Sequence, residues 1–168
     1  MFRLLNLVAL LVAIGAASSA LAGSKRAGNG RDQSGHRHEM ESFSAGQPGD
    51  AKRPARVIQV IMLDGGGKMS FVPDRIDVRQ GEQIRFMLRN DGELEHEFVL
   101  ANHVENLGHA ATMKINPDMV HDAANAKRLQ PKGTAETLWR FTKTGEFEFA
   151  CLIPGHSESG MIGIVTVE

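Results

Sequence analysis

One segment near the C-terminus combines three side chains that bind soft metal ions. The stretch FEFACLIPGHSESGM, residues 147–161, holds Cys151, the only cysteine in the chain, with His156 five residues later and Met161 after five more. A thiolate, an imidazole and a weak thioether belong to the ligand set of copper sites that alternate between Cu(I) and Cu(II), in which a second histidine completes the set. The segment therefore predicts three of the four ligands of a redox-active copper ion.

The second histidine must come from elsewhere in the chain, and His96 is the candidate, because it opens a predicted apolar strand well upstream. Zinc is the rival metal, but it prefers harder or more numerous anionic ligands and rarely takes methionine. Each residue also has an ordinary structural interpretation: Cys151 as a small core side chain, Met161 as strand packing and His156 as a turn residue. Their coincidence within eleven residues favours copper.

The predicted secondary structure explains how one loop can present these groups together. In GEFEFAC, alternation puts Phe147, Phe149 and Cys151 on one face, which must point inward because the phenylalanines are apolar. The cysteine then lies at the inner end of a strand. A Pro-Gly pair turns the chain, and His156 returns toward the sulfur, so that thiolate, imidazole and thioether can face a single point.

From about Ala55 onward, the chain consists of short strand-like segments separated by turns. The β-branched run ARVIQVIML ends at DGGG, and QIRFMLRN alternates strictly between two faces, as half-buried strands do. The other strand-like segments are KMSFVP, RIDVRQGE, EHEFVL, TAETLWRFT, FEFACL and MIGIVTVE. Seven or eight such strands predict an all-β fold, a β-sandwich, as one domain over residues 55–168.

Residues 101–131 interrupt this rhythm, because they are rich in alanine and poor in β-branched residues. We interpret them as an insertion between two strands, with a helix from about Val104 to Lys114 that Pro117 would end. Long insertions in compact domains are often functional.

The insertion carries a possible second copper site. His109 and Met113 are four residues apart and share a face if that part is helical. Met119 and His121 follow the proline turn and could fold back toward them, which would give a two-histidine, two-methionine set suited to Cu(I). Alternatively, the methionines seal the end of the sandwich and the histidines are solvated. His103 is interpreted as a surface residue.

The first 22 residues are typical of a secretory signal. Arg3 precedes a short apolar run, and Ala20 and Ala22 fit the small-residue cleavage rule, so we place the cut after Ala22. The alternative is an uncleaved membrane anchor, but the apolar run is short for a span. Export predicts a periplasmic protein with no membrane span after cleavage.

Residues 23–54 are dominated by glycine, serine and charged residues and are predicted to be a disordered tether. Within it, the HRHEM stretch offers His36, His38 and Met40, which could bind copper weakly or be incidental. The whole chain has a formal net charge of −1 with mixed signs, which argues against a nucleic-acid partner. One cysteine cannot form an internal disulfide, so in an oxidising compartment its thiol needs another role.

The site segment and its surroundings resemble the cupredoxins, the small blue-copper proteins. The Cys-x4-His-x4-Met spacing is similar to that of rusticyanin and auracyanin, and HEF, the His- and Met-bearing insertion and GEFEFACLIPGH are similar to periplasmic cupredoxins of bacterial copper tolerance. The resemblance covers about 55–168 and implies an eight-stranded Greek-key sandwich with copper bound by His96, Cys151, His156 and Met161. Many cupredoxins have Asn or Ser after the upstream histidine, where it braces the cysteine. Glu97 stands there instead, which puts that bond in question.

Three functions follow for comparison. The first is periplasmic one-electron transfer by a single type 1 copper in copper homeostasis or tolerance, with an unidentified redox partner protein and a monomeric chain. The second is Cu(I) sequestration or handling through a second His/Met site without a dedicated electron-transfer partner, in which cuprous oxidation could take part. The third, a multicopper oxidase or copper nitrite reductase, needs more than one such domain, so we expect no enzyme of that kind.

Overall fold

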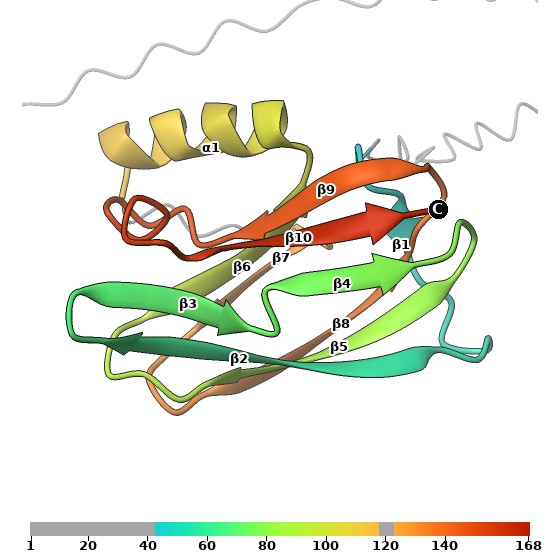
Figure 1. Ribbon diagram of the computed structural model, residues 1–168, viewed down its shortest axis with the longest axis horizontal. Coiled ribbons are helices and arrows are strands. Elements are labelled where there is room, and N and C mark those ends of the chain that lie inside the picture. The colour runs from blue at the N-terminus through green and yellow to red at the C-terminus, as the bar shows by residue number, and fades with distance from the viewer. Residues whose placement is uncertain (1–42, 118–122) are drawn as a thin grey trace, which may run out of the picture. The chain divides into compact units, whose positions relative to one another are not determined.

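The computed structural model describes residues 43–117 and 123–168, which lie within the compact unit His38–Glu168. Within these ranges the chain forms two five-stranded sheets that face each other and one helix, α1 (His103–Ile115) (Figure 1). The first sheet has the strand order β1-β8-β5-β2-β3, and the second has the order β4-β10-β9-β6-β7. The strands are β1 (Gln47–Pro48), β2 (Arg56–Gly65), β3 (Lys68–Val72), β4 (Arg75–Val78), β5 (Gln83–Asn90), β6 (His96–Ala101), β7 (Ala126–Leu129), β8 (Thr134–Arg140), β9 (Gly145–Ala150) and β10 (Ile162–Val167).

The predicted β-sandwich is confirmed, and its strand order shows long-range crossovers. β2 pairs in parallel with β5, and β10 pairs in parallel with β4, although both pairs are separated along the chain. Two strands were not expected. One is β1, and the other is β7, which lies at the end of the predicted insertion and pairs antiparallel with β6. The segment AKRL has no β-branched residue, so the pairing with β6 determines its conformation, and local propensity does not.

Aromatic side chains fill the space between the sheets. Phe149 has ring centroids 5.1 Å from Phe71 and 5.4 Å from Phe98, and Phe86 lies 5.2 Å from Phe98. All four are essentially inaccessible to solvent. Burying side chains of this size stabilises a fold by about 1.5–3 kcal/mol each, and it fixes the strand ends from which the candidate ligands project.

Helix α1 covers the outer face of the second sheet over β6 and β9 (Figure 1). Its N-cap is Asn102, whose side chain accepts from the N–H of Glu105, and the helix ends just before Asn116 and Pro117. This agrees with the predicted helix to within a residue at each end. Because both faces of β6 are covered, all six of its residues are buried.

The predicted disordered tether is too long at its C-terminal end. The ring of Phe43 packs edge-on against Trp139 with centroids 5.1 Å apart, Ala45 is fully buried, and β1 pairs with β8. The side chain of Gln83 also bonds the backbone of Asp50. The structured part therefore begins at least twelve residues before the predicted boundary, because Trp139 supplies an apolar surface that composition alone does not reveal.

The remainder of the tether, with His36, His38 and Met40, lies outside the described residues, as does the predicted signal segment 1–22. In the part of the chain that the structure describes, no helix has the length and apolar character needed to cross a membrane.

Candidate metal centre

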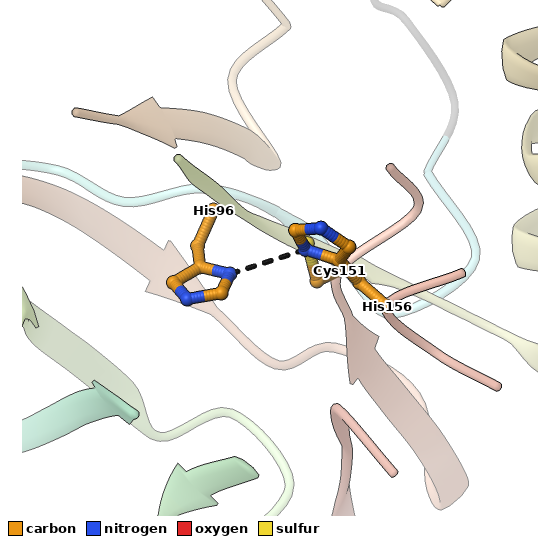
Figure 2. A group of neighbouring side chains, drawn as sticks. All are labelled: His96, Cys151 and His156. Carbon is orange, nitrogen blue, oxygen red and sulfur yellow. Dashed lines mark hydrogen bonds between the residues drawn. The ribbon is translucent and has the colours of Figure 1, made fainter. Parts of the chain in front are cut away.

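Three of the predicted ligands meet at one end of the sandwich (Figure 2). His96 is the first residue of β6, Cys151 directly follows β9, and His156 lies in the loop between β9 and β10. The Nδ1 atoms of the two histidines are 3.2 Å apart, and Cys151 Sγ is 3.3 Å from His156 Nδ1. The three donor atoms all lie within 4.8 Å of one another. An ion bound by imidazole and thiolate at about 2.0–2.3 Å would hold its donors about 3–4 Å apart, so the spacing fits a shared metal.

Backbone hydrogen bonds fix the loop that carries Cys151, His156 and Met161. The N–H of Cys151 donates to the carbonyl of Met161 at 3.1 Å, and the N–H of Met161 donates to the carbonyl of His156 at 3.1 Å. Gly155 and Gly160 have positive φ values of 90° and 104°, which let the loop turn this tightly. Met161 is fully buried, and its backbone is hydrogen-bonded to that of the cysteine, while its role as a fourth ligand stays a prediction.

The surroundings of the Cys151 thiol oppose its deprotonation unless a positive charge lies nearby. The thiol is fully buried, and burial raises its pKa to about 12. The backbone N–H of Glu97 donates to its sulfur at 3.2 Å, which favours the thiolate. Because metal ions bind the thiolate, an ion at this point would displace the proton and supply the missing positive charge.

Glu97 stands where the resemblance stated above leads one to expect Asn or Ser, directly after the upstream histidine. The structure shows that the bond to sulfur comes from its backbone, so the identity of the side chain does not decide it. The carboxylate itself is buried and lies 3.7 Å from the guanidinium of Arg128. Burial raises the pKa of this carboxyl in spite of that neighbour.

The surroundings of His156 favour the neutral form that a metal requires. Burial, and then the neighbouring His96, lower the pKa of His156, which is half-buried. His96 is fully buried, and its second ring nitrogen, Nε2, lies 2.9 Å from Asp64 Oδ2. We did not predict Asp64 from the sequence. The only signal was an acidic residue at the end of a β-branched strand, next to DGGG, and that pattern is typical of any turn.

The predicted second site stays a prediction, because only two of its four residues lie in the part of the chain that the structure describes. His109 and Met113 both lie on α1, and Met113 is buried against Val99, Ala126, Ala150 and Leu152. Met119 and His121 fall outside the described residues. His103 is exposed and pairs with Glu148 at 2.8 Å, in keeping with a surface residue.

The sequence was also compared with known proteins. A family model described as copper binding proteins of the plastocyanin/azurin family matches residues 58–168. The chain belongs to this cupredoxin family. Among its cupredoxin relatives, the copper-resistant cuproprotein CopI of Rubrivivax gelatinosus is 46% identical over 132 residues, which cover 79% of this chain and 78% of that protein. The copper-resistant cuproprotein CopI of Pseudomonas aeruginosa is 36% identical over 152 residues, covering 73% and 82%.

Solved structures show the same cupredoxin fold. Auracyanin B matches with a TM-score of 0.58 and 20% identity, over 74% of this chain and 96% of that chain. Reduced auracyanin from Roseiflexus castenholzii matches with a TM-score of 0.56 and 21% identity, over 69% and 99%. A multicopper oxidase from Campylobacter jejuni matches with a TM-score of 0.51 over only 31% of its length. The family identifies this cupredoxin as a copper-binding protein.

Proposed function

We propose that this chain is an exported type 1 copper protein that transfers single electrons in the periplasm as part of copper tolerance. The observation that supports this most directly is the convergence of His96 Nδ1, His156 Nδ1 and Cys151 Sγ within 4.8 Å, in a chain of the plastocyanin/azurin family. Two relatives that cover most of the chain are copper-resistant cuproproteins, which supports the role in tolerance.

In this proposal, His96, Cys151 and His156 hold the ion, with Met161 as a weaker axial ligand. Copper would supply a one-electron couple between Cu(I) and Cu(II). The protein's contribution is to hold the donors in nearly one geometry for both oxidation states. Strand β6, the end of β9 and the hydrogen-bonded loop of residues 151–161 provide that rigidity.

The half-buried ring of His156 gives the proposed route for electrons. Cys151, His96 and Met161 are inaccessible to solvent, whereas His156 retains an exposed portion. A redox partner that docks over this ring would come closest to the metal. The chain then acts as a monomer and needs no enzyme site of its own.

A second candidate is Cu(I) handling at a His/Met site on α1. It is favoured by the placement of His109 and Met113 on one helix, which covers the sheet that carries Cys151. In that case the chain would bind more than one copper ion, and electron transfer to a dedicated partner would be unnecessary.

The test is the visible spectrum of the mature chain, residues 23–168, after addition of Cu(II). We expect an intense thiolate-to-copper band at one copper per chain, absent in Cys151→Ser and lost or strongly altered in His96→Ala. The matched control is His103→Ala, which removes an exposed histidine and should leave the band unchanged. A wild-type chain without the band, or a band that survives Cys151→Ser, would exclude the proposed site.

The proposed export is tested separately on the intact protein. When the full chain is produced with its first 22 residues, the periplasmic fraction should contain a product whose mass begins at Gly23. Retention of the complete chain in the membrane fraction would support the uncleaved anchor instead.

A further inference from the structure

A carboxylate from the opposite sheet reaches the upstream histidine of the candidate metal centre. Asp64 lies near the end of β2, in the first sheet, whereas His96 opens β6 in the second. The Oδ2 atom of Asp64 lies 2.9 Å from Nε2 of His96, and the two side chains are 10% and 0% exposed. This contact joins the two sheets at the end of the sandwich where the ligands converge.

The loop between β5 and β6 encloses this carboxylate. The backbone N–H groups of Glu93 and Leu94 donate to Asp64 Oδ2 at 2.9 and 3.1 Å. Gly92 is so close that a Cβ atom there would lie 1.8 Å from the same oxygen. Burial works toward a higher pKa for Asp64, but the bonds from Leu94 and Glu93, with His96, hold its pKa below the usual value. The group is therefore a carboxylate, and it faces the ring as an acceptor.

An acceptor at one ring nitrogen determines what the other can do. A neutral imidazole carries one proton, and the carboxylate places it on Nε2. The Nδ1 atom, which faces His156, then carries the free lone pair. Partners of this kind orient metal-binding histidines and raise their basicity.

We propose that Asp64 is a positioning residue that keeps the His96 proton on Nε2 and, through its negative charge, favours Cu(II) over Cu(I) at this site. The inference rests on the proposed function and deepens it, because it names the group that sets the reduction potential through His96. A negative charge near the ligand stabilises Cu(II) more strongly than Cu(I), so Asp64 lowers the reduction potential of the Cu(II)/Cu(I) couple.

Two substitutions separate the hydrogen bond from the charge. In Asp64→Asn, the amide oxygen can occupy the place of Oδ2 and accept the same bonds, but the negative charge is lost. Asp64→Ala removes both. The matched control is Asp91→Asn, which removes one carboxylate from the same loop, where the group is 38% exposed and paired with Arg89.

Four measurements are made on the mature chain and its variants. Long-range ¹H–¹⁵N NMR of the copper-free protein reports which ring nitrogen of His96 carries the proton. Competition with chelators gives the Cu(II) and Cu(I) affinities, and redox titration of the copper-loaded protein gives the potential. Urea unfolding identifies any variant that fails to fold, in which case Asp64→Asn alone carries the test.

We expect the wild type and Asp64→Asn to show the proton on Nε2, and Asp64→Ala to show a mixture of the two tautomers. Both Asp64 variants should lose about 10- to 100-fold in Cu(II) affinity. A tenfold loss at constant Cu(I) affinity raises the potential by about 59 mV. Asp91→Asn should change the affinity less than threefold.

The inference is overturned if Asp64→Ala keeps the wild-type tautomer, or if Asp64→Asn shifts the potential no more than Asp91→Asn does. Either result in a protein whose wild type shows the thiolate-to-copper band leaves the proposed function intact. If the wild type shows no such band, the proposed function fails, and the tautomer in the copper-free chain still decides the role of Asp64.

Discussion

Replacing Gly92 with alanine should break the contact between Asp64 and His96 without altering either residue. The added Cβ would lie 1.8 Å from Asp64 Oδ2 and 2.7 Å from its Cγ, closer than real side chains approach. The backbone at Gly92 does not require glycine for its φ angle, so the effect of the substitution comes from the collision alone. Because Gly92 is buried within its loop, the carboxylate has to move.

The size of the effect follows from the bonds that the carboxylate would lose. Asp64 Oδ2 contacts the N–H groups of Glu93 and Leu94 and the ring of His96. Hydrogen bonds to charged groups contribute about 1.5–3 kcal/mol each. Because the loop can relax, we count the loss of one to two of these bonds and expect the unfolding free energy to fall by about 2–4 kcal/mol.

Gly108→Ala is the matched control, because it is the same substitution but should raise the unfolding free energy. Gly108 lies within α1, and a Cβ there would meet no atom within 4 Å. Alanine in a helix is favoured over glycine by about 0.5–1 kcal/mol, so this variant should be more stable. Urea unfolding of the copper-free protein measures both, with the fluorescence of Trp139, the only tryptophan and fully buried, as the signal.

A double-mutant cycle identifies the atom that the new methyl group meets. In an Asp64→Ala background the carboxylate is absent, so Gly92→Ala should cost less than about 1 kcal/mol. If Gly92→Ala costs as much in that background as in the wild type, or stabilises the protein as Gly108→Ala does, Asp64 is not held in the place described.

Three further predictions concern the N-terminal segment, acid stability and copper stoichiometry. Phe43→Ala should lower the unfolding free energy by about 1–3 kcal/mol, because a half-buried ring and an edge-on aromatic contact are lost. If urea unfolding shows a loss below about 0.5 kcal/mol, the ring of Phe43 does not pack against the domain. A hydrogen bond from Arg56 holds the pKa of Glu82 below its ordinary 4.5, so its stabilisation is present above pH 4.5 and is lost as the pH falls through the lower folded-state value. The unfolding free energies of the wild type and Glu82→Gln should converge over that acid range, and a difference independent of pH would contradict this. If α1 binds Cu(I), the double variant His109→Ala, Met113→Leu should bind less Cu(I) per chain in a chelator competition and keep the thiolate-to-copper band. An unchanged Cu(I) stoichiometry would mean that these two residues do not bind copper.

The strands that bury a regular face could be predicted from the sequence. In β5, Ile84, Phe86 and Leu88 share one face, and all three are buried. Such a strand carries its own signal, because one face must leave water. Helix α1 was also predictable, because its alanine-rich composition favours a helix and Pro117 marks where that helix must end.

Segments whose structure depends on a distant partner were predicted less well. Phe43 and Ala45 pack because Trp139 lies nearby, and β7 is a strand because β6 offers it an edge. Both partners are remote in sequence, so no local pattern reports them. Asp64 is the same case within the candidate site, because its neighbour His96 is 32 residues away.

The sequence by itself determined the chemistry available to this protein: one thiol, a histidine and a methionine in one loop, and an apolar alternation that turns the thiol inward. Only the tertiary structure decided which remote groups surround that thiol. Pairing of β6 with β9 in the second sheet brings a ring nitrogen of His96 within 4.8 Å of the cysteine sulfur, and packing of the two sheets places the Asp64 carboxylate behind the ring. The physical reason is that side-chain type is local, whereas the distance between two strands depends on how the whole core packs.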